Sequence, residues 1–126
     1  MFEPADLFDL SQTDHAALFA GCTYAWEALS KIQAYIENNL RPALNNRCEG
    51  RAYIGQRVSI GEGTTVEDGV MIKGPAIIGR NCQIRHNAYI REDVVIGDNC
   101  VVGNSCELKT VLLFNECQVP HFNYVG

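Results

Sequence analysis

The chain has 126 residues, enough for one domain with a real hydrophobic core and too few for two independent cores. Its composition, 47% hydrophobic and 20% charged, is that of a folded globular protein and excludes a disordered or coiled-coil chain. Fifteen acidic residues against ten basic ones give a net charge of −5, which disfavours a nucleic-acid partner. No apolar run approaches the roughly 20 residues of a membrane-spanning helix, so we expect no membrane partner.

The first residues are acidic and lack the basic start and apolar stretch of a secretory signal. We therefore expect the protein to be cytoplasmic, in a reducing compartment where its six cysteines stay free thiols. Disulfide bonds are the alternative, which the position of the cysteines in the pattern described below disfavours.

The sequence divides into two regimes, and the first, residues 1–47, reads as helical. A short helix is predicted over residues 14–20 and a longer one from about Thr23 to Asn39, ended by Pro42. Apolar residues recur at helical spacing on one face of the longer helix: Leu29, Ile32, Ile36 and Leu40. We expect this segment to cap the open end of the structure that follows it.

A period of six residues organises the second regime. Each block of six from residue 54 opens with Ile, Val or Leu, ten times in succession without an insertion: Ile54, Ile60, Val66, Ile72, Ile78, Ile84, Ile90, Ile96, Val102 and Leu108. Phe114 and Pro120 continue the phase in degraded form. A fixed period of this kind is the signature of a repeat protein.

The fifth position of each block is small or medium-sized, and three of the six cysteines, Cys82, Cys100 and Cys106, occupy it. A large aliphatic side chain at position one and a smaller one at position five suit a narrow triangular tube, in which each six residues form one strand and a turn. The cysteines at fifth positions are thus interpreted as inward-facing packing residues.

This pattern resembles the hexapeptide-repeat family, whose members form left-handed parallel β-helices. The resemblance implies a mainly β fold, a left-handed β-helix over residues 48–126 with the helical cap before it, and a homotrimer. Because the rhythm is still running at Gly126, we expect the β-helix to be truncated there and to continue in a longer protein.

Residues 18 apart in such a helix lie above one another. One outward column is then Lys73, Arg91 and Lys109, and another is Glu67, Arg85, Gly103 and His121. Stacked cations repel unless an anion lies between them, so the first column is either solvated decoration or a phosphate-binding ladder. His86 and His121 share a face about two coils apart without a third ligand, so no metal site is predicted.

Two linked motifs sharpen the resemblance. Gly103-Asn104-Ser105-Cys106-Glu107-Leu108-Lys109 and then His121-Phe122-Asn123-Tyr124-Val125-Gly126 are similar to the Gly-Asn-x-x-Glu-x-Lys and His-x-x-Tyr-x-Gly pattern of one enzyme family. This family is the acetyltransferase domain of the bifunctional N-acetylglucosamine-1-phosphate uridylyltransferase/glucosamine-1-phosphate acetyltransferases. Sugar-1-phosphate nucleotidylyltransferases of archaea carry a similar β-helical tail.

The resemblance implies an acyltransferase that moves an acetyl group from acetyl-CoA to an amino-sugar 1-phosphate, without a metal. His121 matches the catalytic base, Arg91 and Lys109 match residues that hold the sugar phosphate, and Tyr124 matches a substrate-contacting tyrosine. The family's coenzyme A contacts lie on later coils, so no cofactor-binding residue is assigned.

Two other functions stay open. The β-helix could be a non-catalytic trimerisation or regulatory module associated with a sugar-1-phosphate nucleotidylyltransferase related to UDP-N-acetylglucosamine pyrophosphorylase. The same architecture could also acylate another amine or a hydroxyl.

Overall fold

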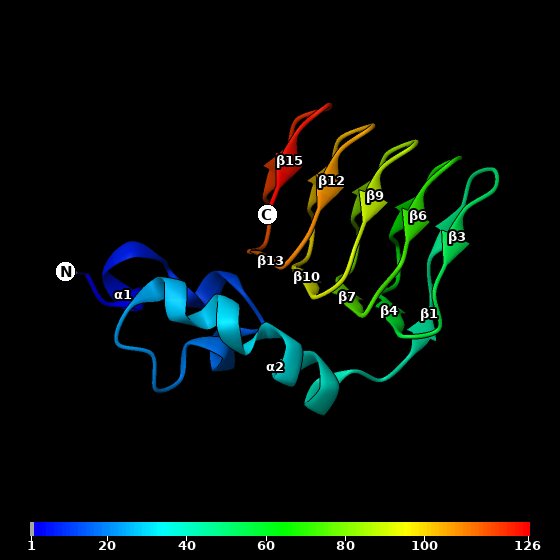
Figure 1. Cartoon of the computed structure of the whole chain (residues 1–126). Coiled ribbons are helices and arrows are strands. Elements are labelled where there is room, and N and C mark those ends of the chain that lie inside the picture. The colour runs from blue at the N-terminus through cyan, green and yellow to red at the C-terminus, as the bar shows by residue number, and fades with distance from the viewer. Residues whose placement is uncertain (1) are drawn as a thin grey trace.

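The computed structural model describes residues 2–126 as a β-solenoid of five coils with a helical segment beside it (Figure 1). Each coil contributes one short strand to each of three parallel five-stranded sheets, which we name sheets A, B and C. The architecture is consistent with a left-handed β-helix, which confirms the mainly β fold predicted from the period of six.

Each sheet is a stack of every third strand, and the chain passes from sheet A to B to C in every coil. Sheet A consists of β1 (Ala43–Leu44), β4 (Val58–Ile60), β7 (Ala76–Ile78), β10 (Val94–Ile96) and β13 (Val111–Leu113). Sheet B consists of β2 (Arg47–Cys48), β5 (Thr65–Val66), β8 (Gln83–Ile84), β11 (Val101–Val102) and β14 (Gln118–Val119). Sheet C consists of β3 (Tyr53–Ile54), β6 (Met71–Ile72), β9 (Tyr89–Ile90), β12 (Glu107–Leu108) and β15 (Tyr124–Val125).

The interior of the solenoid is filled by the first and fifth positions of the hexads. The first-position side chains from Ile60 to Leu108 are all at most 1% exposed. The fifth positions, which lie at the corners and include Cys82, Cys100 and Cys106, are equally closed. Burial of both positions in every coil removes a continuous apolar column from water, which is the main stabilising contribution in a stacked repeat.

The corners use the left-handed backbone conformation. From Asn81 onward the corner residues have φ between 49° and 64°: Asn81, Asn87, Asp93, Asn99, Ser105, Thr110, Glu116 and Phe122. Asparagine and aspartate tolerate this conformation better than other side chains, which explains their frequency at the fourth position of the hexads.

One coil is a residue shorter than the others, and this corrects the phase predicted after Leu108. Val94 pairs with Ala76, 18 residues earlier, but with Val111, only 17 residues later. The inward residues of the last coil are therefore Leu113, Val119 and Val125, and not Phe114 or Pro120. The missing residue falls in the turn after β12.

The helical segment is more irregular than the sequence predicts. Its elements are α1 (Pro4–Leu7), η1 (Leu10–Gln12), η2 (Ala16–Phe19), η3 (Ala25–Lys31) and α2 (Ile32–Asn39), where η marks a 3-10 helix. The predicted longer helix begins as η3, which has about three residues per turn instead of 3.6. Because the period changes, Ile32 and Ile36 are buried as predicted while Leu29 and Trp26 remain about half exposed.

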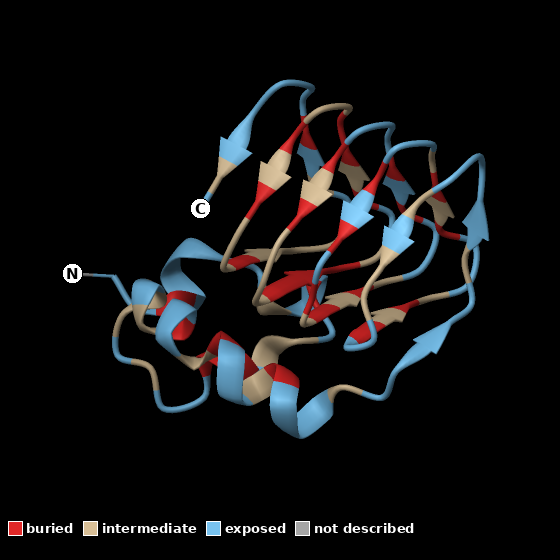
Figure 2. Ribbon diagram, turned by 45° about the vertical axis from the view of Figure 1, so that its right-hand side comes forward, coloured by how far each residue is buried: buried red, intermediate tan, exposed pale blue. Residues whose placement is uncertain are grey.

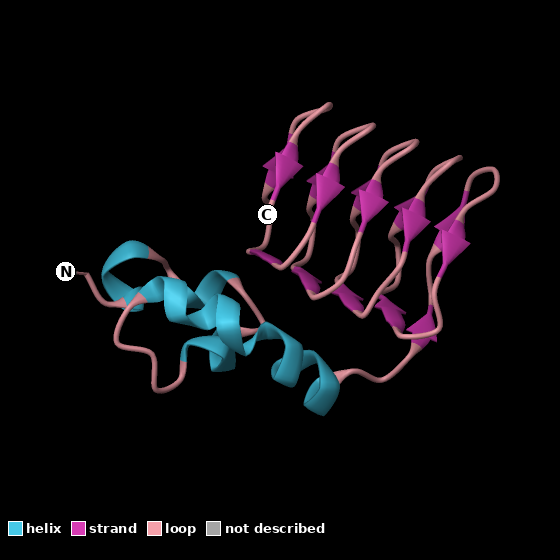
Figure 3. Cartoon of the chain, in the orientation of Figure 1, coloured by secondary structure: helices cyan, strands magenta, loops and turns pink. Residues whose placement is uncertain are grey.

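This segment lies along a flank of the solenoid and does not cap its first end, contrary to the sequence prediction. Leu18, Phe19, Ile32 and Ile36 form a second hydrophobic core with Val95, the outward-facing residue in the middle of β10. Figures 2 and 3 show the helices beside sheet A, with red buried patches where the two meet. The outward residues of sheet A are apolar in the central coils, so the helices cover these residues and leave the ends open.

Candidate functional site

Three cations stack at the corner between sheets C and A, which we call the C–A corner. The backbone amide of Lys73 donates to the carbonyl of Ile90, and that of Arg91 donates to the carbonyl of Leu108, at 2.8 and 2.9 Å. Lys73, Arg91 and Lys109 therefore follow β6, β9 and β12 in one vertical column, which we call the cation column.

Two carboxylates of the same chain neutralise much of the cation column. Arg91 Nη1 donates to Glu107 Oε2 at 2.9 Å, and Arg91 Nη2 lies 3.4 Å from Glu92 Oε1. Lys73 Nζ lies 3.6 Å from Glu92 Oε2. The hydrogen bond to Glu107 is the main cause that raises the pKa of Arg91 above its ordinary value. Lys109 has no ion pair within residues 2–126.

Tyr124 lies next to the cation column on the outer face of sheet C. It pairs in register with Glu107 of the neighbouring strand, and its side chain is largely exposed. Its hydroxyl lies close against Gly126, at the C–A corner. Arg91, Glu107 and Tyr124 thus form a continuous polar band that runs from the corner onto the sheet.

His121 lies at the other edge of sheet C, at the corner after β14, which we call the B–C corner. The amide of the next residue, Phe122, donates to the carbonyl of Asn104 at 3.0 Å. Because the preceding coil is one residue short, His121 stacks above Asn104, and Pro120 stacks above Gly103. The predicted column that placed His121 above Gly103 is therefore wrong by one position.

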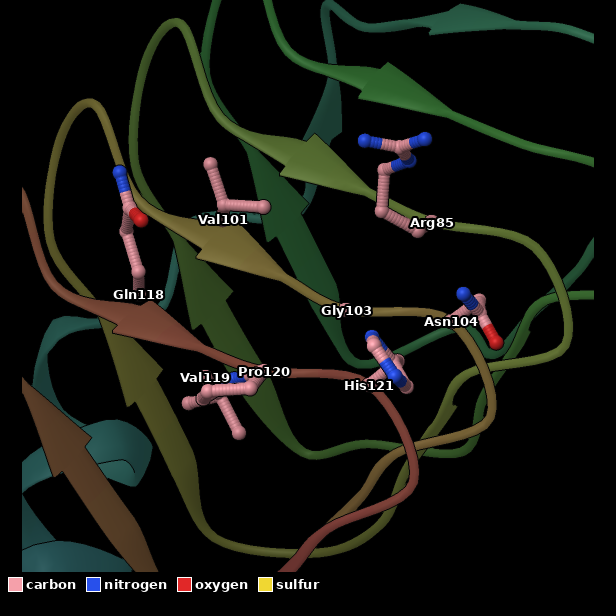
Figure 4. Close-up of a pocket in the computed structure, with 8 residues that line it drawn as sticks. All are labelled: Arg85, Val101, Gly103, Asn104, Gln118, Val119, Pro120 and His121. Carbon is pink, nitrogen blue, oxygen red and sulfur yellow. The ribbon is translucent and has the colours of Figure 1, made fainter.

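An open hollow of about 280 Å³ adjoins His121 (Figure 4). Gly103 has no side chain between Arg85 below and Pro120 above, which leaves space in this outward column. Figure 4 shows His121 and Asn104 at one rim and Arg85 at the opposite rim, over residues of β11 and β14. The lining residues are Arg85, Val101, Gly103, Asn104, Gln118, Val119, Pro120 and His121.

The structure brings some of the predicted site residues together and separates others. Arg91, Lys109 and Tyr124 gather at or near the C–A corner, in three successive strands of sheet C. His121 precedes Tyr124 by three residues but belongs to the opposite corner. The cation that shares the hollow with His121 is Arg85, whose Nε lies 3.4 Å from Glu67 Oε1.

Sequence reasoning gave no role to three residues that shape this region. Glu107 was visible in the Gly-Asn-x-x-Glu-x-Lys motif, but its bond to Arg91 needs the stacking of two coils. Glu92 and Asn104 had no signal beyond their place in a turn.

The remaining nucleophiles and metal-ligating groups do not form a second site. Within residues 2–126, no three His, Cys, Asp or Glu side chains gather as a metal site would require, and Asn104 separates His86 from His121 in their column. A hydrogen bond with Cys100 lowers the pKa of the Cys82 thiol to about 7. Cys82 is nevertheless only 1% exposed, so a substrate cannot reach it.

Comparison with known proteins identifies the repeat. Residues 75–110 match the family model described as bacterial transferase hexapeptide (six repeats). A search of curated proteins found no significant match. Over the described residues, none of the helices has both the length and the apolar character needed to cross a membrane.

Proposed function

We propose that this hexapeptide-repeat protein of the bacterial transferase type is an acetyl-CoA-dependent N-acetyltransferase, or the sugar-binding half of one, acting on an amino-sugar 1-phosphate. The observation that carries the proposal is the band across sheet C, in which cations, a carboxylate, a tyrosine and a histidine follow one another between two corners. Their residue types and spacing match the two linked motifs of glucosamine-1-phosphate acetyltransferases.

In the proposed reaction, His121 is the general base. The amino nitrogen of the sugar attacks the thioester carbonyl carbon, the carbon–sulfur bond breaks, and coenzyme A leaves as a thiolate that takes up a proton. His121 accepts the proton that the attacking nitrogen loses. An imidazole suits this role because its ordinary pKa lies near neutral pH, and His121 is exposed and without an ion pair among the described residues.

Arg91 and Lys109 are the proposed anchors of the sugar phosphate. A guanidinium and an ammonium stacked one coil apart can each make a charge-assisted contact with phosphate oxygens. Tyr124 lies beside this pair and would contact the sugar ring. The coenzyme A contacts are not assigned to any residue of this chain.

A homotrimer is part of the proposal. The helices already cover the outer face of sheet A, whereas sheet C leaves Tyr53, Met71 and Tyr124 exposed. A second copy of the chain against an open flank would bury these side chains. Sedimentation should then show a species of about three chains at micromolar concentration, and a monomer alone would contradict the trimer.

One observation favours a second function, a non-catalytic β-helix associated with a sugar-1-phosphate nucleotidylyltransferase. Glu92 and Glu107 already pair with Lys73 and Arg91, so the cation column needs no bound phosphate to limit its charge repulsion. In that case the motif residues would stabilise the coils and support no acetyl transfer.

Steady-state kinetics of acetyl transfer from acetyl-CoA to glucosamine 1-phosphate distinguish the two. His121→Ala should lower kcat by about 10²–10⁴, the usual contribution of a positioned acid–base group, with little change in KM. Arg91→Ala and Lys109→Ala should mainly raise the KM for the sugar phosphate, by about tenfold to a hundredfold, because each removes a charge-assisted contact.

Matched controls are available in the same columns. His86→Ala removes an exposed histidine two coils below His121, and Arg57→Ala removes an exposed arginine that pairs with Glu37 of α2 at 3.9 Å. Both should leave the kinetics unchanged. Acetyl transfer by His121→Ala at the parental rate would end the assignment of the base, and no transfer by the parental chain would favour the non-catalytic function.

A further inference from the structure

Glu92 occupies the place in the cation column that an anionic ligand would take. Its two carboxylate oxygens face different cations, Oε1 toward Arg91 at 3.4 Å and Oε2 toward Lys73 at 3.6 Å. The side chain is only 27% exposed, and Oε2 is covered by protein without a hydrogen bond. A carboxylate covered in this way is held by charge rather than by close hydrogen bonds, which leaves it able to exchange for a stronger anion.

The shortened coil explains why the third cation also acts on Glu92. The turn that contains Glu92 has three residues between its strands, but the turn above it has only Lys109 and Thr110. The Thr110 amide donates to the Glu92 carbonyl at 3.1 Å, so no residue is stacked directly above Glu92. The carboxyl pKa of Glu92 is lowered by a backbone hydrogen bond within the residue and further by the charges of Arg91, Lys73 and Lys109, against an opposing effect of burial.

We infer that Glu92 is an internal counter-ion of the cation column, and that it makes the column selective for dianionic phosphate monoesters over monoanions. The inference rests on the proposed function, because it assumes that the column binds the substrate phosphate.

Charge balance gives the reason. The three cations and the two carboxylates Glu92 and Glu107 leave a net charge of +1. A carboxylate ligand that displaces Glu92 exchanges one negative charge for another and gains little. A phosphate dianion brings one additional negative charge and more acceptor oxygens, so it competes successfully.

Direct binding measurements test the inference without any acetyl transfer. Calorimetric or NMR titration of the folded chain with inorganic phosphate, and separately with acetate, is done at pH 8 and low ionic strength, since salt screens the column. Glu92→Gln should tighten phosphate binding by about fivefold and should make acetate binding detectable, so that the preference for the dianion decreases.

The matched control is Asp93→Asn, which removes the same charge one residue away. The charges that act on Asp93 include Arg57 and Glu37, on the side of α2, and asparagine suits its positive φ as it does at Asn81 and Asn87. Asp93→Asn should change phosphate affinity less than twofold. Glu92→Ala provides a second substitution, and melting curves verify that each variant is folded.

The outcomes separate this inference from the proposed function. Equal tightening in Glu92→Gln and Asp93→Asn would overturn the inference, because only the overall charge would then matter. Phosphate binding by the parental chain that Glu92→Gln leaves unchanged would also overturn it, while the column remained a phosphate site. If neither the parental chain nor any variant bound phosphate, both the inference and the proposed role of the column would fail.

Discussion

The outer faces of sheets A and C are built from the same repeat and have different fates. Both sheets turn aliphatic residues inward at matching positions in every coil. On the outside, the central strands of sheet A carry Ile77 and Val95, which the chain's own helices cover. Sheet C instead presents Met71, Glu107 and Tyr124 to solvent or to a partner. The inward positions therefore determine that a coil forms, and the outward positions determine what each flank binds.

The largest expected difference between the two flanks comes from an added charge. Val95→Asp places an unpaired carboxylate at a position that is 0% exposed, between the solenoid and the helices, and should lower the free energy of unfolding by about 3–5 kcal/mol. Met71→Asp changes the outward position of sheet C, which is 42% exposed, and should cost less than about 1 kcal/mol. Denaturant titration measures both, and similar losses would show that sheet C is equally covered.

A cavity on the helical side should cost somewhat less. Ile32→Ala removes a fully buried side chain from the core that α2 shares with Val95, at an expected cost of about 2–4 kcal/mol. Leu29→Ala, on the preceding turn but half exposed, should cost under about 1 kcal/mol. Limited proteolysis should then cut the helical segment before the coils, and simultaneous cleavage of both would mean that the two regions unfold as one unit.

Gly103→Ala tests the close stacking at the B–C corner. A Cβ at this position would lie 2.5 Å from the His121 amide nitrogen and 2.7 Å from the Pro120 carbonyl carbon, both backbone atoms that must shift. We expect a loss of about 1–3 kcal/mol in stability, the usual cost of overpacking, together with a lower kcat because His121 is displaced. A melting temperature equal to that of the parental chain would contradict this stacking.

The smallest effect concerns pH and the helical flank. His15 Nδ1 is hydrogen-bonded to Tyr35 Oη at 2.6 Å, and burial lowers the pKa of His15 below its ordinary 6.5. The unfolded chain therefore binds a proton more readily, so the contribution of His15 to stability is complete above pH 6.5 and is lost as pH falls through the lower folded-state pKa. Melting curves from pH 7.5 to 5 should show a smaller decline for His15→Gln than for the parental chain, and identical declines would exclude His15 as the cause.

Much of the fold was predictable because two positions in every six have only one physical solution. Aliphatic residues from Ile60 to Leu108 must face inward in each coil, and this sets the strands, the corners and the stacking by 18 residues up to the last coil. The shortened turn escaped prediction, although Leu113, Val119 and Val125 already formed an aliphatic series one residue earlier than Phe114 and Pro120.

The sequence by itself determined the solenoid, the vertical order of Lys73, Arg91 and Lys109, and the two motifs that suggest acetyl transfer, because each depends only on residue type and period. Tertiary structure decided where the helices lie, since a flank and an open end are equally apolar targets for them. It also decided that His121 stacks above Asn104 and that Glu92 and Glu107 neutralise the cation column. Contacts of this kind depend on the length of a single turn and on the reach of side chains between coils, neither of which a period of six residues specifies.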